Sequence, residues 1–326
     1  MLRGDILSLS RLITMVENDL VGTPDILARI YPHLGGAYHV GITGPPGAGK
    51  STLTSALATG LRREGATVGI VACDPSSPFS GGALLGDRIR MESLALDDGV
   101  FVRSMATRGA LGGMSRKAHA VARLLEAFGK DYVLLETVGV GQTEVDVRDV
   151  VDTTVLVFTP IVGDYIQAMK AGIIEIADVF VINKMDLGNA AAIEENLAAV
   201  LAMRVKRGEW RPPIIQAQAT EHIGVKELYG ALGAHRTFLR ESGLGIRRRS
   251  ESRKREFEEH VRERLLALVT ASVGRNPEYL AARSDVGECK ADPYQACEDV
   301  LADKSLWEEV VALARNGGSG AGPHGE

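Results

Sequence analysis

The sequence contains few cysteines, and none belongs to a paired motif. Its three cysteines, Cys73, Cys289 and Cys297, are isolated and form no C-x-x-C pair. Neither a disulfide framework nor a zinc site is therefore indicated. The seven histidines are also scattered, with no H-x-x-H or H-E-x-x-H pair. We expect no metal centre built from these two residue types.

Long apolar runs and a strong net charge are also missing. No apolar stretch approaches the roughly 20 residues needed to cross a bilayer. Charged residues interrupt the first 20 positions as well, which argues against a secretory signal: Arg3, Asp5, Arg11, Glu17 and Asp19. The formal net charge is only −5, so nothing global indicates a nucleic-acid or membrane partner. We expect a cytoplasmic protein that binds neither nucleic acid nor membranes.

Strand-like and helix-like patterns alternate from residue 39 to about 236, which is typical of a mostly parallel α/β sheet covered by helices on both faces. Several strand-like runs are continuous in Val, Ile and Leu, as expected for doubly covered strands. The predicted strands are Val40–Thr43, Thr67–Cys73, Val100–Arg103, Tyr132–Glu136, Thr154–Phe158, Val179–Ile182 and Ile214–Ala217. A helix is predicted over Ala190–Lys206.

Four regions are expected along the 326 residues: 1–38, 39–240, 241–315 and 316–326. The first is helical, and is either an arm or a cover for one face of the sheet. The second is the α/β domain. The third is a helical segment without a catalytic pattern, which suggests oligomerisation or docking. The last is rich in Gly, Ser and Pro, so we expect it to be disordered.

The third region opens with a basic run, Arg247–Arg249, which invites a nucleic-acid interpretation. Acids and bases then interleave over 253–263, which favours a solvated helix face with i,i+4 pairs. Apolar residues recur through it at helical spacing: Phe257, Val261, Leu265 and Leu268. Another amphipathic helix is predicted over Asp299–Ala314.

A glycine-rich loop lies between the first predicted strand and a helix with Leu53, Leu57 and Leu61 on one stripe. The loop fits G-x-x-x-x-G-K-[ST] at every fixed position. Its backbone N–H groups and the helix N-terminus form an anion site for phosphates. Lys50 would reach the β- and γ-phosphates, and the Ser51 hydroxyl would bind Mg²⁺. The predicted nucleotide contacts here are Gly44, Pro45, Pro46, Gly47, Ala48, Gly49, Lys50, Ser51 and Thr52.

A second motif, Asn183-Lys184-Met185-Asp186, follows the strand Val179–Ile182. N-K-x-D at a strand end recognises guanine, because its carboxylate accepts hydrogen bonds from N1–H and the exocyclic amine. Adenine offers no matching pair of donors, and a site built for hydrogen bonds rejects an analogue that lacks them. Gln218, Ala219 and Thr220 follow the next strand, where a backbone N–H would contact guanine O6. The sequence therefore predicts GTP rather than ATP.

Three carboxylates are candidates for the Mg²⁺ site. Glu136 ends a predicted strand, where a second contact to the ion belongs, and Gly139 after it would let the backbone approach the γ-phosphate. Asp74 follows another strand and is placed to hold Mg²⁺ or the attacking water. Asp87 could do the same, or could be the N-cap of a helix over 88–96.

Six blocks of the sequence resemble the MeaB/ArgK family of GTPases, in the signal-recognition-like class: GPPGAGKST, DPSSPFSGGALLGDRIRM, RSMATRGALGGMSRKA, ETVGVGQTE, GDYIQAMKAGIIEIAD and NKMD. The resemblance covers roughly residues 5–275 and weakens beyond them. It implies a P-loop NTPase fold with helical N- and C-terminal extensions, the latter forming a homodimer.

The resemblance also implies a partner and a mechanism. Such proteins bind an adenosylcobalamin-dependent acyl-CoA mutase, either methylmalonyl-CoA mutase or a relative. They gate cofactor delivery by the cobalamin adenosyltransferase and protect or reactivate the mutase, which accelerates their slow GTP hydrolysis. The implied phosphate and Mg²⁺ residues are Lys50, Ser51, Asp74, Asp87 and Glu136, and Asn183, Lys184 and Asp186 read the base. The loop Gly163–Lys170 would be a switch, with Gln167 and Lys170 swinging toward the nucleotide.

Two other functions remain open. A kinase linked to amino-acid transport would fit the ArgK name, but nothing resembles a protein-kinase catalytic loop. A metallochaperone GTPase of the nickel-insertion type shares the P-loop class, but would need His and Cys clusters that this sequence lacks.

Overall fold

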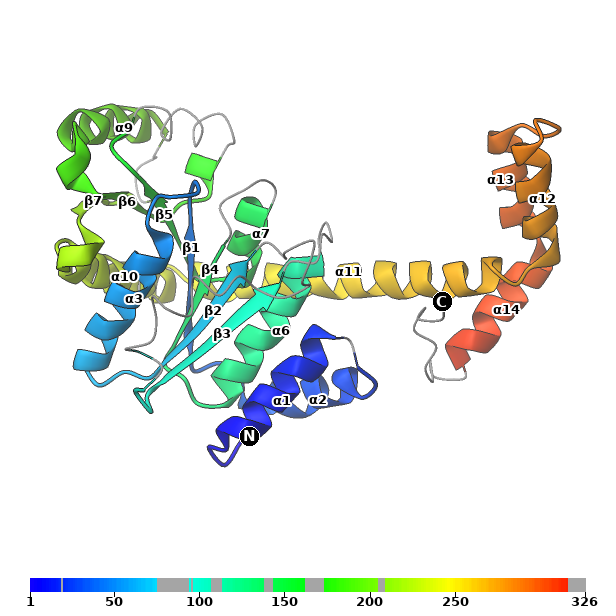
Figure 1. The fold of residues 1–326 in the computed structure, drawn as a ribbon, viewed down its shortest axis with the longest axis horizontal. Helices are drawn as coiled ribbons and strands as arrows, with labels where there is room; N and C mark the ends of the chain where they lie inside the picture. Colours follow the sequence, from blue (N-terminus) through cyan, green and yellow to red (C-terminus); the bar gives the residue numbers. More distant parts are fainter. Residues whose placement is uncertain are drawn as a thin grey trace. The chain divides into compact units, whose positions relative to one another are not determined.

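The computed structural model describes residues 1–18, 20–74, 94, 96–106, 113–137, 143–161, 173–204 and 209–315 (Figure 1). Within these residues seven parallel strands form one sheet in the order β3-β2-β4-β1-β5-β6-β7. They are β1 (Tyr38–Thr43), β2 (Val68–Asp74), β3 (Val100–Ala106), β4 (Tyr132–Glu136), β5 (Thr153–Phe158), β6 (Val179–Asn183) and β7 (Ile214–Ala217). The seven predicted strands are confirmed, with β3 continuing to Ala106 rather than ending at Arg103.

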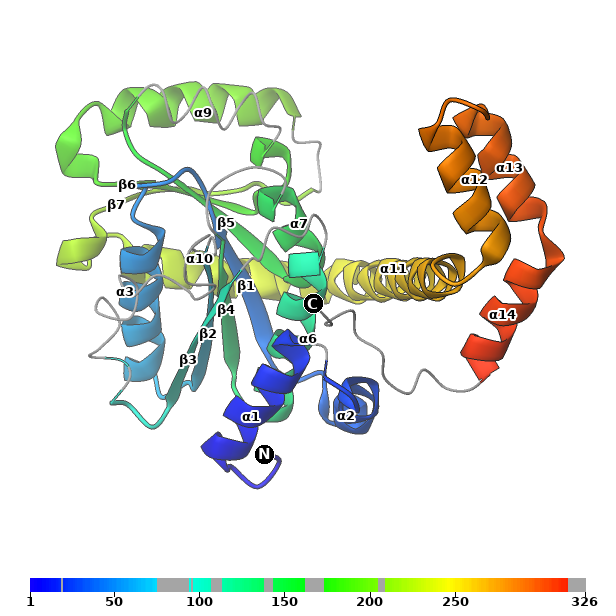
Figure 2. The same cartoon turned by 45° about the vertical axis from the view of Figure 1, so that its right-hand side comes forward.

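Helices cover both faces of the sheet, as the continuous apolar strands predicted. The helices of this part are α1 (Ile6–Glu17), α2 (Thr23–Ile30), α3 (Lys50–Arg63), α6 (Gly113–Ala127), α7 (Thr143–Val150), α9 (Ala190–Arg204) and α10 (Val225–Glu241). Short 3₁₀ turns lie at Tyr31–His33, Ile173–Glu175, Met185–Leu187 and Ala219–Glu221. The predicted helix Ala190–Lys206 corresponds to α9 (Figure 2).

Alternate residues of each strand point to opposite layers. Val155 and Val157 of β5 pack with Leu57 of α3 and Leu232 of α10 in one cluster. Leu156 of β5 belongs to a second cluster with α9. The helices α1, α2, α6 and α7 share a third cluster, on β2, β3 and β4. The N-terminal helices α1 and α2 thus pack against α6, on one face of the sheet (Figure 1).

The chain divides into two compact units, residues 1–252 and 253–326. Helix α11 (Leu244–Val273) begins in the first unit and continues into the second, which also contains α12 (Pro277–Gly287), α13 (Pro293–Ala302) and α14 (Lys304–Arg315). The core of the second unit includes Leu268, Val300, Leu306 and Val310. In the described part of the chain, no helix combines the length and apolar character needed to span a bilayer.

The single helix predicted over Asp299–Ala314 is wrong. Asp303 has extended dihedrals, φ −66° and ψ 119°, and separates α13 from α14. Its carboxylate accepts hydrogen bonds from the Ser305 N–H at 2.9 Å and from Asn276 Nδ2 at 2.8 Å. An aspartate that caps the next helix in this way ends the preceding one, and the apolar pattern runs on across the break.

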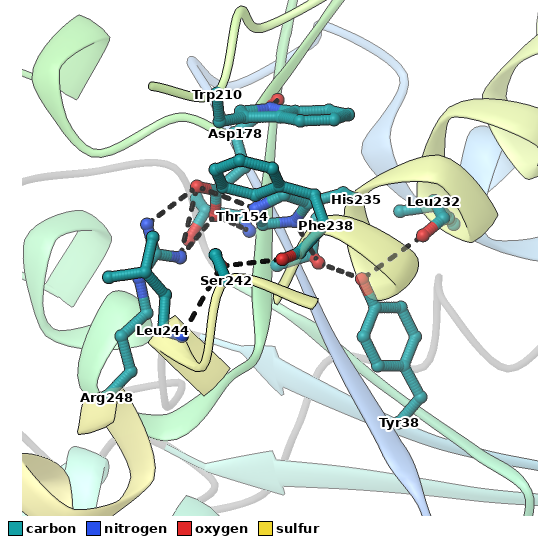
Figure 3. A network of polar contacts seen from close by, with 11 residues as sticks. Tyr38, Thr154, Asp178, Trp210, Leu232, His235, Phe238, Ser242, Leu244 and Arg248 are labelled. Atoms are coloured by element: carbon teal, nitrogen blue, oxygen red, sulfur yellow. Dashed lines mark hydrogen bonds and ion pairs between the residues drawn. The ribbon is translucent and has the colours of Figure 1, made fainter. Parts of the chain in front are cut away.

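The amino ends of β5 and β6 hold a buried polar network (Figure 3). The Asp178 carboxylate accepts from the Thr154 N–H at 3.0 Å and from two guanidinium nitrogens of Arg248, each at 3.2 Å. His235 is fully buried between Asp178, 3.4 Å from its Nε2, and Thr153, whose hydroxyl lies 2.7 Å from its Nδ1. Because Arg248 lies in the N-terminal part of α11, this network holds that end of the helix against the amino ends of β5 and β6.

A second ion pair holds the same N-terminal part of α11. Arg249 forms a two-pronged contact with Asp152, from Nε at 2.7 Å and from Nη2 at 2.8 Å. Asp152 also accepts from the His39 N–H of β1 at 2.9 Å. Two neighbouring arginines of α11 are thus bound to the amino ends of three strands, β1, β5 and β6.

We predict that the network makes folding stability fall in mild acid. Burial lowers the pKa of the His235 imidazole below its ordinary value of 6.5. As the pH falls, His235 is protonated in the unfolded chain before it is protonated in the folded protein. The free energy of unfolding is therefore highest above the pKa of the unfolded imidazole and decreases as the pH falls below that pKa. His235→Asn should shrink the loss of unfolding free energy between about pH 7.5 and about pH 5.5, measured by urea denaturation.

The exposed His33 provides a matched control, because His33→Asn should leave the wild-type pH dependence intact. An equal pH dependence in wild type and His235→Asn would contradict the prediction.

Candidate functional site

The glycine-rich loop of residues 44–49 joins β1 to α3, and its glycines are required by geometry. Gly44, Gly47 and Gly49 have φ angles of 141°, 77° and 86°. A Cβ at Gly44 would lie 1.8 Å from the carbonyl oxygen of Val157 in β5, and a Cβ at Gly49 would lie 2.4 Å from Asn183 Nδ2. The loop can follow this path only because Gly44 and Gly49 have no Cβ, since β5 and the Asn183 side chain occupy the space that a Cβ would need.

Lys50 opens α3 and is largely buried in the loop that precedes it. Its ammonium donates to the carbonyl oxygens of Gly44 at 2.7 Å and Pro45 at 3.0 Å. The first turn of a helix presents N–H groups that have no intrahelical acceptor and carries the positive end of the helix dipole. A cation and an array of amides thus face the same small volume, which is an arrangement suited to phosphate groups.

Ser51 and Glu136 meet at the carboxyl ends of two neighbouring strands. The Ser51 hydroxyl donates to a Glu136 carboxylate oxygen at 2.5 Å. Glu136 is the last residue of β4 and pairs in register with Ile42 of β1, so the sheet itself delivers the carboxylate to the loop. A hydroxyl and a carboxylate are hard oxygen ligands of the kind that Mg²⁺ takes, so the residues present fit that ion.

Other predicted residues of this site fall partly or wholly outside the described part of the chain. Asp74 is the last residue of β2, whose Ala72 lies level with Glu136 in the sheet, and its side chain is not described. Asp87, Gly139, Gln167 and Lys170 lie outside the described residues altogether.

Asn183 connects the phosphate side of the site to the predicted base loops. The side chain is 2% exposed, with Nδ2 donating to the Ala48 carbonyl oxygen at 2.8 Å. Its Oδ1 accepts from the Ala219 N–H at 3.1 Å. One amide therefore holds together the loops that follow β1, β6 and β7.

Each of the two base loops also presents one predicted contact residue to solvent, Asp186 in the first and Thr220 in the second. Lys184 adopts a left-handed conformation with φ 59°, and the short turn that follows leaves Asp186 exposed. After β7, the Gln218 N–H donates to the Ile223 carbonyl oxygen at 3.1 Å, while Thr220 is exposed. The backbone N–H groups of Gln218 and Ala219 thus both have acceptors within the protein.

Two buried threonines at this site carry no motif of their own in the sequence. Thr137 Oγ1 donates to Thr43 Oγ1 at 3.0 Å, between the residue that precedes the phosphate loop and the residue that follows Glu136. Thr43 directly precedes the glycine-rich loop and Thr137 directly follows Glu136, and this position beside a motif is the one sign of their role in the sequence. Their pairing depends on strand register, which the motifs do not contain.

Within the described ranges, no group of three or more His, Cys, Asp or Glu residues is placed to hold a metal ion. Of the three free cysteines, Cys289 and Cys297 are exposed and Cys73 is buried. The described side chains of the site offer hydroxyl, carboxylate, amide and ammonium groups.

Comparisons with known proteins show what the whole chain is similar to. The model of the family described as methylmalonyl Co-A mutase-associated GTPase MeaB matches residues 9–273. A Pyrococcus abyssi protein named as a putative GTPase is 46% identical over 309 residues, covering 93% of this chain and 94% of that protein. A mouse protein named as a mitochondrial homolog of methylmalonic aciduria type A is 41% identical over 199 residues, 60% of this chain and 48% of its own length. The crystal structure of an LAO/AO transport system kinase has a TM-score of 0.66 and 28% identity, and the match covers 95% of both chains.

We predict that Gly44 and Gly47 differ sharply in tolerance to alanine. Gly44→Ala forces a methyl group into the backbone of β5, so GDP affinity should fall about 100-fold or more. At Gly47 a Cβ would have nothing within 4 Å, which leaves only the strain of a positive φ and a loss of about 10-fold at most. Titration with a fluorescent GDP analogue measures both, with melting curves to confirm folding. Equal affinities would show that the close approach of β5 is not what demands glycine.

Proposed function

The chain belongs to the methylmalonyl-CoA mutase-associated GTPase family named MeaB, and from this premise we propose that it is a chaperone for an adenosylcobalamin-dependent acyl-CoA mutase. It hydrolyses GTP, as its relatives are named to do. The proposed client is methylmalonyl-CoA mutase or a related enzyme, because the family name carries that association. Hydrolysis would time cofactor loading from the adenosyltransferase and the protection or reactivation of the client.

The observation that supports a timed switch is the convergence of three loops on Asn183. A GTP molecule would place its guanine between the loops after β6 and β7 and its phosphates in the loop after β1. The Asn183 amide is hydrogen-bonded to both regions, at Ala48 and at Ala219. We infer that Asp186 accepts from the guanine edge and that Lys184 packs on the ring. The loops Glu136–Gly139 and Gly163–Lys170 would then sense the γ-phosphate, with Gln167 and Lys170 as switch residues.

For hydrolysis we assign binding and orientation to the residues around α3. Lys50 and the first-turn amides would hold the β- and γ-phosphates, and Asp74 would orient the attacking water. Ser51 and Glu136, with Asp74 and Asp87, would hold Mg²⁺. The ion, when bound, would neutralise charge on the phosphate oxygens.

We also propose that the second unit mediates a homodimer. On α11 the side chains of Phe257, Val261 and Leu265 recur every fourth residue and are 69%, 42% and 50% exposed. An exposed apolar stripe of this kind is typical of a surface that another protein covers. A second copy of the chain is the occupant that the family resemblance favours.

The alternatives have less support. The similar crystal structure bears the name of a transport system kinase, but the N-K-x-D loop at Asn183–Asp186 favours GTP and its hydrolysis. A nickel metallochaperone would be favoured by a metal-binding cluster, and the described residues contain none.

The proposed base recognition predicts a swap of nucleotide preference. Asp186→Asn replaces an acceptor pair with an amide that can pair with xanthine, so GTP affinity should fall about 100-fold and xanthosine triphosphate affinity should rise. Asp186 is exposed, so folding should be unaffected, and the exposed Asp98→Asn is the matched control. Competition binding with both nucleotides is the measurement. An unchanged preference would refute the assignment.

The proposed partner predicts nucleotide-dependent binding. Calorimetry against methylmalonyl-CoA mutase should show an affinity that differs about 10-fold or more between GDP and a non-hydrolysable GTP analogue, in line with typical coupling energies. Lys50→Ala should abolish the dependence on nucleotide while leaving nucleotide-free binding of the mutase in place. No binding in any nucleotide state, with this mutase and with related acyl-CoA mutases, would refute the chaperone proposal.

A further inference from the structure

We propose that Thr137 is a positioning residue for the Mg²⁺ site, acting through its hydrogen bond to Thr43. The bond joins the residue after Glu136 to the residue before the glycine-rich loop. The inference rests on the proposed Mg²⁺ site at Ser51 and Glu136. It adds a second pair of residues, Thr43 and Thr137, whose role would be to fix where the Glu136 carboxylate stands.

Two hydrogen bonds join the carboxyl ends of β1 and β4, one between backbone groups and one between side chains. Ile42 and Glu136 are register partners in the parallel ladder, and the next backbone bond runs from the Thr137 N–H to the Ile42 carbonyl oxygen at 3.0 Å. The register between the two strands ends at the Ile42–Glu136 pair. The Thr137–Thr43 bond, at 3.0 Å, is made by the side chains of the residues that directly follow that pair.

The surroundings make this bond stronger than one at a surface. Thr43 is fully buried and Thr137 is 7% exposed, so water has little access to replace either partner. A hydroxyl buried without a partner destabilises the fold, whereas valine has the same shape and would not. The threonine hydroxyls therefore serve the contact between the strands rather than the filling of space.

The consequence concerns the Ser51–Glu136 distance. Glu136 is bonded covalently to Thr137, so a rotation of the backbone at Thr137 moves the carboxylate relative to Ser51, now 2.5 Å away. Mg²⁺ demands near-ideal octahedral geometry and tolerates little displacement of its ligands. A pair that fixes the backbone beside one ligand should therefore affect Mg²⁺-dependent steps more than binding of the nucleotide itself.

The test compares GDP release with and without Mg²⁺. In the wild type, Mg²⁺ should slow the dissociation of a fluorescent GDP analogue relative to EDTA. In Thr137→Val this slowing should fall about 10-fold, with release in EDTA unchanged, because one buried hydrogen bond is lost. Thr137→Ser keeps the hydroxyl and should restore the wild-type ratio. Thr59→Val removes a hydroxyl bonded within α3, to Ser55 at 2.9 Å, and should change nothing.

Thr43→Val breaks the same bond from the other side and should reproduce the effect, which keeps the test valid if one variant folds poorly. Melting curves and GTP turnover at saturating Mg²⁺ complete the comparison. A Thr137→Val protein with the wild-type Mg²⁺ ratio, or with equal changes in Mg²⁺ and in EDTA, would overturn the inference. The absence of any Mg²⁺ effect in the wild type would instead overturn the proposed metal site.

Discussion

Parallel pairing is the constraint on which the rest of this structure depends. Strands that all run in one direction place their carboxyl ends at one edge of the sheet, and the loops that leave those ends must share it. The phosphate loop leaves β1, Glu136 ends β4, Asn183 ends β6 and Ala219 follows β7. Groups separated by more than a hundred residues therefore meet without any special contact to gather them. The Asn183 side chain then fixes the distances that pairing alone leaves loose.

Much of this arrangement could be predicted, because its signals are local. A buried strand is a run of Val, Ile and Leu such as 179–182, and the phosphate and base loops are short motifs directly after such runs. Because a parallel sheet aligns its strand ends, Lys50, Ser51, Glu136 and Asp186 can be placed at one edge from these motifs. The sequence pattern does not give the order of the strands in the sheet, because no residue of β4 indicates that this strand pairs with both β1 and β2.

The features that could not be predicted depend on that order or on single polar contacts. Thr43 and Thr137 are 94 positions apart, and their bond follows from register alone. The network of Asp178, His235 and Arg248 requires α10 and α11 to cross the amino ends of β5 and β6, where the sequence shows only scattered charges. The break at Asp303 has no signal in the apolar pattern, because one carboxylate, bonded to Ser305 and Asn276, outweighs an uninterrupted run of helical spacing.

The packing around the phosphate loop bears on how such sequences should be compared across evolution. Gly44 and Gly49 are demanded by Val157 and Asn183, which are parts of the protein itself. A descendant that had stopped using nucleotides would still need both glycines, because Val157 and Asn183 leave no room for a Cβ at either position. Persistence of the glycines thus records common ancestry of the fold. Their presence alone therefore does not mark a retained nucleotide-binding activity.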